Sequence, residues 1–242
     1  MPITENLELA ELAAAVSPHA VALRPSLERL FLHDLLNTAA GLHVLASLFA
    51  SDALPDAQLA ESKVLFSDLA ANLVDDIQHQ RELLQAERGE LALRIEEIDL
   101  RPFLENVRRV CSRTVVGKNR QLRLAQVPDA LVYSDAVLVR RSIVNLIKNA
   151  AEATAAGGIV TLTCQLTPGT VRFLVHNPGS MDDFVRQQIF RRPFSTKTGG
   201  DRGLGTYSVK LFVERYLRGH VECVSTEADG TVVSFQIPDL RG

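Results

Sequence analysis

Two stripes of apolar side chains at helical spacing mark the first third of the chain. Spacings close to a heptad repeat predict amphipathic helices from about residue 27 to 49 and from 57 to about 88. The segment 51–56 between them predicts a loop, with Asp56 capping the second helix. We therefore expect an αα-hairpin. The stripes consist of Phe31, Leu35, Leu42, Leu45 and Phe49, with Thr38 beside them, and of Leu59, Phe66, Leu69, Leu73, Ile77 and Leu84.

A hairpin on its own leaves its apolar stripe in contact with water. Pairing two copies into a four-helix bundle buries both stripes, so we expect a homodimer through this part of the chain. The alternative is that the hairpin packs against the C-terminal part of its own chain. Residues 1–24 are rich in Ala and are expected to form a separate helical segment.

Gly89 marks the expected end of the hairpin, because predicted strands and helices alternate after it. This order predicts an α+β sandwich with the helices on one face of the sheet. Residues 177–203 are rich in Gly, Pro, Ser and Thr and are too long for an ordinary connection, so we expect a functional lid there. The predicted strands cover about 91–95, 121–125, 158–166, 170–176, 220–225 and 231–237, and the predicted helices about 101–116, 135–155 and 206–218. The expected domains are 1–24, 25–88 and 99–242, with 89–98 as a linker.

Composition argues against several classes of protein. The 26 Lys and Arg are balanced by 29 Asp and Glu, and only 5% of residues are aromatic, so a nucleic-acid-binding face is not expected. No apolar run approaches the about 20 residues of a membrane span. Acidic Glu5, Glu8 and Glu11 stand where a signal peptide needs basic residues. The three distant cysteines and the unpaired histidines argue against a zinc site and favour reduced thiols in a cytoplasmic protein.

The first candidate site is His33-Asp34-Leu35-Leu36-Asn37 on the first predicted helix. At 100° per residue His33 lies about 200° from Leu35, so it faces away from the apolar stripe. Asn37 shares the face of His33, and Asp34 can accept a proton from the imidazole or fix its tautomer. An exposed His beside a carboxylate suits nucleophilic chemistry. The alternative is an ordinary solvated helix face.

The second candidate site is a polar stripe made by Asn145, Asn149 and Glu152, at spacings i, i+4 and i+7 on one predicted helix. Asn disfavours helix interiors because its side chain competes for backbone hydrogen bonds. Two of them in one stripe therefore indicate a purpose other than helix stability. A row of oxygen donors suits Mg²⁺, although a plain polar helix face is the alternative.

The third candidate site is the glycine-rich segment 199–206, which leads directly into a predicted helix. Glycines let the backbone approach a phosphate, and a helix N-terminus supplies unpaired N–H groups. The segment matches neither the P-loop nor the Rossmann fingerprint. Lys197 and Arg202, with Arg191 and Arg192, place positive charge in the lid, which suits a polyphosphate. The alternative is a flexible turn whose basic residues keep it solvated.

Taken in order, these motifs resemble those of bacterial two-component sensor histidine kinases. The motif that begins at His33 is similar to the phospho-accepting H box, and the one from Asn145 to Asn149 is similar to the N box. Asn177-Pro178-Gly179 stands where the G1 box belongs. Residues 190–197 resemble the F box, and Gly203-Leu204-Gly205 resembles the G2 box. The resemblance covers about residues 25–238.

The resemblance implies a dimerisation and phosphotransfer hairpin followed by an ATP-binding sandwich of the Bergerat type. It implies that ATP phosphorylates His33, with Asp34 as general base, and that the phosphoryl group passes to an aspartate on a response regulator receiver domain. Asn37 matches the position that orients water in members with phosphatase activity. Asn149, with Asn145, would hold Mg²⁺. The implied nucleotide-binding residues are Asn145, Lys148, Asn149, Asn177, Gly179, Lys197, Arg202, Gly203, Leu204, Gly205 and Thr206.

The sequence departs from the family pattern in the G1 box. Asn177 stands where the family has an Asp that accepts from the adenine amino group, and Met181 replaces the second glycine. An amide oxygen can accept the same bond without the charge. These departures leave open a non-catalytic dimeric phosphotransfer or scaffold protein with a degenerate ATP-binding domain. With no sensor region in the sequence, the input is expected through residues 1–24, an upstream partner protein or a missing region.

Overall fold

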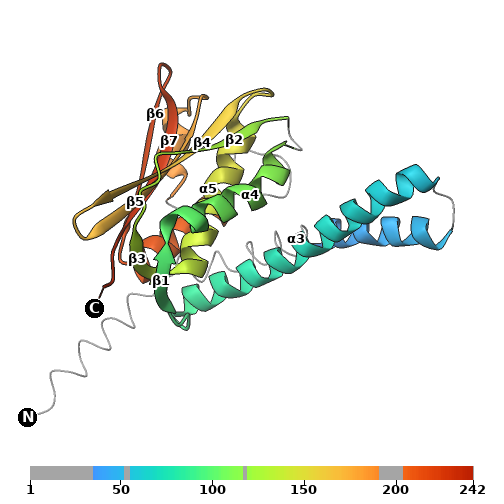
Figure 1. Cartoon of the computed structure of the whole chain (residues 1–242), viewed down its shortest axis with the longest axis horizontal. Helices are drawn as coiled ribbons and strands as arrows, with labels where there is room; N and C mark the ends of the chain where they lie inside the picture. Colours follow the sequence, from blue (N-terminus) through green and yellow to red (C-terminus); the bar gives the residue numbers. More distant parts are fainter. Residues whose placement is uncertain (1–34, 52–54, 117–118, 191–203, 242) are drawn as a thin grey trace, which may run out of the picture. The chain divides into compact units, whose positions relative to one another are not determined.

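The computed structural model describes residues 35–51, 55–116, 119–190 and 204–241. Contacts between residues divide the chain into two units, with the division in the main chain after Gln78. The first unit contains the helical hairpin, and the second contains the mixed sheet with its helices (Figure 1). No helix in the described ranges is long and apolar enough to cross a membrane.

The first unit confirms the predicted hairpin. Residues 35–50 form one helix, and the second helix, α3, runs from Asp56 to Arg88, so its last part belongs to the second unit. The rings of Phe49 and Phe66 meet edge to face, with centroids 5.7 Å apart, and join the two helices. Large apolar side chains on both helices are nevertheless more than half exposed. They are Leu36, Val44, Val64, Leu65 and Val74.

The second unit is built on a five-stranded sheet of order β2-β4-β5-β7-β6, in which β2 and β4 are parallel and the other pairs antiparallel. A separate antiparallel pair consists of β1 and β3. The strands are β1 Ile95–Asp99, β2 Gln121–Ala125, β3 Leu131–Asp135, β4 Ile159–Thr167, β5 Thr170–Asn177, β6 His220–Thr226 and β7 Gly230–Pro238. The helices are α4 Leu100–Val116, α5 Ala136–Ala153, α6 Asp183–Gln188, α7 Leu204–Lys210 and the π-helix η1 Leu211–Tyr216.

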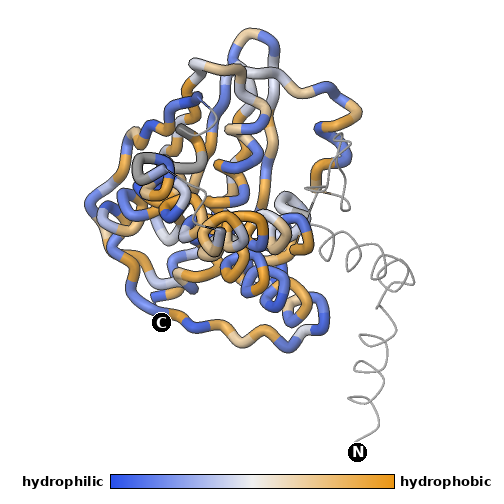
Figure 2. The backbone as a smooth tube through the Cα atoms, turned by 90° about the vertical axis from the view of Figure 1, so that its right-hand side faces the viewer, coloured by the Kyte–Doolittle hydropathy of each residue, from blue (hydrophilic) through white to orange (hydrophobic). Residues whose placement is uncertain are grey.

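Alternation of side chains along the strands explains the layered architecture. In β5 every second residue is buried, beginning with Val171, Phe173 and Val175. The rings of Phe173 and Phe235 lie 5.0 Å apart between neighbouring strands. The tube view shows the same mixture of apolar and polar segments along this unit (Figure 2). Helix α5 buries Leu138, Ile143 and Leu146 in the same core, so the predicted α+β fold is confirmed.

Several predicted boundaries differ from the observed ones. Strand β1 lies at 95–99 rather than at 91–95, so it begins inside the expected linker. Strand β3 and helix α6 are additional elements, and both are only five or six residues long. The last predicted helix begins earlier, at Leu204, and continues as a π-helix. The domain limits expected from the sequence stay a prediction.

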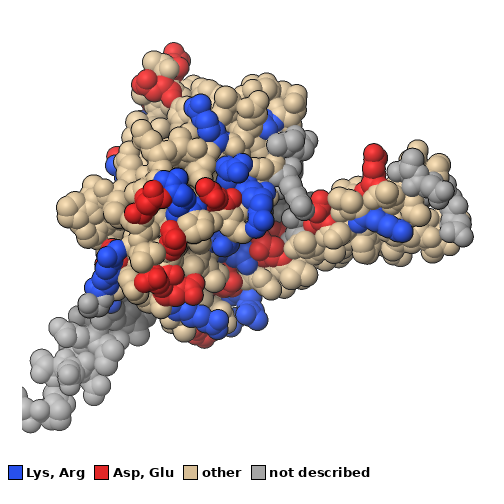
Figure 3. Space-filling model, viewed as in Figure 1, with Lys and Arg blue, Asp and Glu red and all other residues tan. Residues whose placement is uncertain are grey.

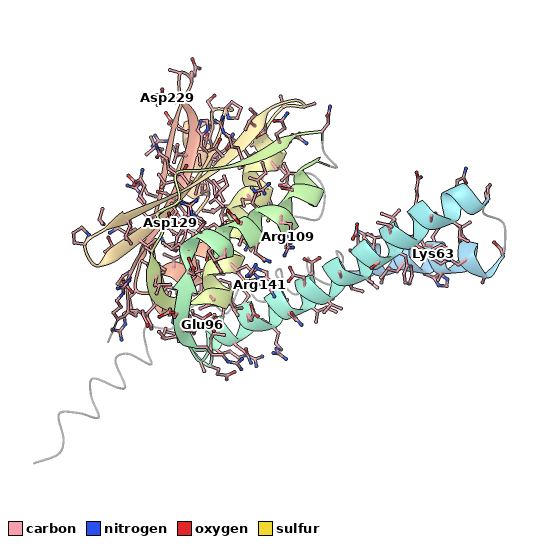
Figure 4. All side chains as sticks on the ribbon, viewed as in Figure 1. Lys63, Glu96, Arg109, Asp129, Arg141 and Asp229 are labelled. Atoms are coloured by element: carbon pink, nitrogen blue, oxygen red, sulfur yellow. The ribbon has the colours of Figure 1, made fainter. Side chains whose placement is uncertain are left out.

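The last ten residues of α3 pack within the second unit. Leu83 and Ala86 are almost completely buried there, at 1% and 0% exposure. Tyr216 donates a hydrogen bond of 2.7 Å to the carbonyl of Ala86. Arg141 on α5 pairs with Glu82, with 3.0 Å between Nε and Oε2, and Figure 4 labels the arginine. This end of α3 is therefore held by α5 and η1.

Candidate functional site

Helix α5 presents the predicted pair of asparagines. Asp135 caps the helix, because its carboxylate accepts from the backbone N–H of Leu138 at 3.0 Å. The Asn145 amide donates to Ser208 Oγ at 2.9 Å, and that hydroxyl donates to the carbonyl of Gly205 at 2.8 Å. This bond uses one N–H of the Asn145 amide and identifies the other amide atom as the acceptor oxygen. The contact brings the start of α7 beside the polar stripe of α5.

Gly205 leaves a space beside Asn149 that a side chain would fill. A Cβ atom at Gly205 would lie 3.5 Å from Asn149 Nδ2 and 3.7 Å from Oδ1, and 3.8 Å from the Cβ of Asn145. The Asn149 nitrogen is buried and has no hydrogen-bond partner among the described residues. A buried amide nitrogen without a partner is costly, so a hydrogen-bond acceptor placed beside it would be favourable.

Asn149 is also suited to a cation. Rotating an amide by 180° exchanges its oxygen and nitrogen, so the same position can present an oxygen. Mg²⁺ prefers such oxygen ligands and usually completes its shell with water and phosphate. In the described ranges no three His, Cys, Asp or Glu side chains gather as a cation site. The amide stripe offers oxygen atoms of the kind that Mg²⁺ accepts.

A second polar cluster lies where β5 ends. Asn177 is 3% exposed, and its amide donates to the carbonyl of Gly179 at 3.2 Å. Thr231 on β7 donates to the same carbonyl at 2.7 Å. Ser225 on β6 contacts the Thr231 hydroxyl at 2.7 Å and accepts from the backbone N–H of Met181 at 2.8 Å. The cluster therefore joins the ends of three strands to the segment that follows Asn177.

The structure describes some of the other predicted site residues, and the rest lie outside the described ranges. Asn37 is exposed on the first helix of the hairpin. Gly205 and Thr206 lie in α7, which begins at Leu204. Lys148 is half-buried on α5 and takes part in an interaction within the protein. Outside the described residues lie His33, Asp34, Lys197, Arg202 and Gly203.

Three polar residues of these clusters were missed in the sequence. Ser208 stands three positions after Gly205, which is the spacing of one helical turn, and this was an available signal. Ser225 and Thr231 face each other across the turn at Asp229-Gly230. The two strands were predicted, but the pairing of these residues depends on the register of β6 with β7.

Charges of both signs lie on the surface, and one tyrosine on α7 is shielded from water. Figure 3 shows Lys and Arg among Asp and Glu on the visible face. Burial, and then the nearby carboxylate of Glu87, raise the pKa of Tyr207 on α7 to about 12, so its hydroxyl stays protonated at neutral pH. That hydroxyl donates to Glu87 Oε1 at 3.2 Å.

Comparisons with known proteins agree with this architecture. Residues 134–241 match the family described as histidine kinase-, DNA gyrase B- and HSP90-like ATPase. Sensor protein DivL of Caulobacter vibrioides is 29% identical over 173 residues, which is 71% of this chain and 22% of that protein. Sporulation kinase B of Bacillus subtilis is 29% identical over 113 residues, 46% of this chain and 26% of that protein. The chain thus spans about a quarter of the length of these relatives.

Solved structures of histidine kinases are similar in fold to this chain. The catalytic domain of histidine kinase ThkA is 25% identical with a TM-score of 0.55, over 60% of this chain and 96% of that domain. A structure of ThkA in complex with the response regulator TrrA matches 99% of this chain and 68% of the ThkA chain, at 19% identity and a TM-score of 0.62. Histidine kinase AdeS of Acinetobacter baumannii matches 86% of this chain and 98% of its own, at 18% identity and 0.60. The last two matches show the fold.

Proposed function

We propose that this chain, which is similar to histidine kinases, is an ATP-dependent protein-histidine kinase. It binds ATP with Mg²⁺ in its C-terminal unit and phosphorylates His33. It then transfers the phosphoryl group to an aspartate of a response regulator. The observation that carries the proposal is the buried Asn149 amide beside Gly205, where a side chain is absent and a ligand atom fits.

In this proposal each polar residue of α5 has a separate task. Asn149 holds the cation, and the Asn145 oxygen assists because its nitrogen is already bound to Ser208. A Mg²⁺ held by these amides would supply positive charge that offsets the charge of the phosphates. Gly205 lets the backbone approach the phosphates, with Thr206 next to it. Lys197 and Arg202 supply further positive charge from the lid, with Gly203 at its end.

In this proposal the phosphoryl group moves from ATP to His33 and then to a carboxylate of the regulator. The imidazole nitrogen attacks the γ-phosphorus of ATP, the bond to the bridging oxygen breaks, and ADP leaves. Asp34 accepts the proton that the imidazole releases. A carboxylate oxygen of the regulator then attacks the phosphorus and frees the imidazole. Asn37, which is exposed on the described helix, orients a water molecule for the phosphatase reaction.

The proposal includes two partners, a second copy of the chain and a receiver domain. Its exposed apolar residues, among them Val44, Val64 and Val74, support pairing with a second copy into a four-helix bundle. The likeness in fold to a kinase solved with its response regulator supports a receiver domain as the second partner. An upstream sensor or input protein supplies the signal.

The test is to find which residue is phosphorylated by labelled Mg-ATP, under conditions that preserve acid-labile phosphate. We expect His33→Ala to abolish labelling and to leave nucleotide binding intact. His43→Ala is the matched control, because His43 is an exposed histidine on the same predicted helix, and it should label as the unmodified protein does. Labelling that persists in His33→Ala would refute the assignment.

The alternative is a dimeric phosphotransfer or scaffold protein without kinase activity. The observation in its favour is the G1 segment, where Asn177 and Met181 depart from the family pattern. Such a protein would accept phosphate on His33 from a phosphorylated receiver domain and not from ATP. Calorimetric titration with Mg-ATP separates the two functions, because the alternative predicts no binding heat.

A further inference from the structure

The hydroxyl of Ser208 on α7 connects two residues of the candidate site. It lies 2.9 Å from the amide nitrogen of Asn145 on α5 and 2.8 Å from the carbonyl oxygen of Gly205. The hydroxyl carries one hydrogen, and a carbonyl oxygen can only accept, so this hydrogen is donated to Gly205. The hydroxyl oxygen therefore accepts from Asn145, and the amide atom that faces it is the nitrogen.

These bonds run in one direction, from the Asn145 N–H through the Ser208 hydroxyl to the Gly205 carbonyl. Ser208 is 0% exposed, so water does not replace either bond. Rotation of the amide by 180° would place its oxygen against a hydroxyl oxygen whose hydrogen is already used. That contact is repulsive, and it would leave a buried hydroxyl with one bond fewer. The Asn145 amide is therefore held in one orientation, with its oxygen on the side away from Ser208.

Ser208 is itself held in place by the residues on either side of it. Val209 is completely buried in the core of the second unit. Tyr207 donates to Glu87 Oε1 at 3.2 Å. A turn of α7 about its axis that moved the Ser208 hydroxyl would break that bond and expose Val209. The hydroxyl is therefore a fixed point against which the Asn145 amide is oriented.

The two amides of the polar stripe differ in this respect. The nitrogen of Asn149 is buried and has no hydrogen-bond partner among the described residues, so its orientation is left to a ligand. Gly205 lies beside both amides, because a Cβ atom there would be 3.5 Å from Asn149 Nδ2 and 3.8 Å from the Cβ of Asn145. Of these two neighbouring amides, only that of Asn145 is oriented by the protein itself.

We propose that Ser208 is a positioning residue that orients the Asn145 oxygen toward Mg²⁺ before the nucleotide binds. This inference rests on the proposed function, in which ATP with Mg²⁺ occupies the C-terminal unit. Mg²⁺ takes oxygen ligands, so an amide that presents its nitrogen cannot bind it. If both orientations were equally populated, only half of the molecules would be competent, and the apparent affinity would fall about twofold. Freedom of the other side-chain torsions increases this loss.

The first test is a double-mutant cycle between Ser208 and Asn145, with the affinity for Mg-ATP measured by calorimetry. We expect Ser208→Ala to weaken binding about 2- to 10-fold, and Asn145→Ala to weaken it at least as much. Ser208→Ala should cause no further loss when Asn145→Ala is already present, because the hydroxyl acts through the amide. Losses that multiply in the double variant would overturn the inference, since the hydroxyl would then act without Asn145.

Ser142→Ala is the matched control for the loss of a buried hydroxyl. Ser142 is 0% exposed on α5, and its hydroxyl donates to the carbonyl of Leu138 at 2.8 Å. This variant should keep the affinity for Mg-ATP, while thermal unfolding without nucleotide shows that both serine variants are folded. An affinity loss in Ser142→Ala as large as that in Ser208→Ala would overturn the inference, because the loss would then follow from any buried hydroxyl.

The second test observes the amide directly in the nucleotide-free protein. The side-chain NH₂ signal of Asn145 in NMR spectra is identified by its disappearance in Asn145→Ala. We expect Ser208→Ala to shift this signal and to speed the exchange of its protons with water, since the hydrogen bond is lost. Ser142→Ala should leave the signal in place. An unchanged signal in Ser208→Ala would refute the positioning role.

The two tests separate this inference from the proposed function. If the unmodified protein does not bind Mg-ATP, the kinase proposal fails and this inference fails with it. If Mg-ATP binds and Ser208→Ala has the affinity of the unmodified protein, the positioning role is refuted and the kinase proposal stands.

Discussion

Replacing Gly205 with Ala should raise stability and weaken nucleotide binding at the same time. The added Cβ lies 3.5 Å or more from its nearest neighbours, which is ordinary van der Waals contact. Ala stabilises a helix over Gly by up to about 1 kcal/mol, so an unfolding midpoint about 1–4 °C higher is expected. The methyl group, however, occupies the space beside Asn149. Losing one charge-assisted contact there costs about 1.5–3 kcal/mol, which is about 10- to 100-fold in affinity.

Thermal unfolding without nucleotide and calorimetric titration with Mg-ATP measure these two effects separately. Gly41→Ala is the matched control, because Gly41 lies in the first helix of the hairpin and its added Cβ would lie 3.7 Å from Leu69. It should show the stability gain without the loss of affinity. Unchanged affinity in Gly205→Ala would mean that the phosphates do not lie beside Asn149. A strong loss of stability would refute the steric reasoning.

Two further predictions concern the contacts between the end of α3 and the rest of the second unit. Leu83 is 1% exposed there. Leu83→Ala should therefore lower the free energy of unfolding, measured by urea denaturation, by about 2–5 kcal/mol. A loss below about 1 kcal/mol would contradict the observed packing. Burial raises the pKa of Tyr207 from 10.0 to about 12. As the pH rises, the unfolded chain therefore loses the phenolic proton before the folded chain does. The free energy of unfolding then falls between about pH 10 and 12. Tyr207→Phe should make the decline in this range shallower, and an unchanged slope would count against the buried hydroxyl.

The hairpin and the polar stripe of α5 could be predicted because each depends on spacing within one helix. The stripe of Asn145 and Asn149 follows from i, i+4 geometry alone. Its meeting with Gly205 could not be predicted, because it depends on how α5 packs against α7, and spacing within one helix carries no information about its neighbour. Strand β3 was missed for a related reason: its five residues have too few alternations to be distinguished from a loop.

The cluster around Gly179 shows the same limit in the sheet. Ser225 and Thr231 are six residues apart and become partners only in the observed register of β6 with β7. A shift by one residue would turn these side chains to the other face. The Gly179 carbonyl would then keep Asn177 as its donor and lose Thr231. This polar cluster at the end of β5 therefore depends on strand register.

The short helix α7 connects two polar contacts that the sequence places in different parts of the protein. Its Ser208 binds Asn145 on α5, and its neighbour Tyr207 binds Glu87 near the end of α3. Adjacent residues on a helix point about 100° apart, so α7 is held from two directions. A movement of α7 toward or away from Asn149 must change at least one of these contacts. The last turns of α3 are thus held within the second unit, although by sequence pattern they are the end of the hairpin.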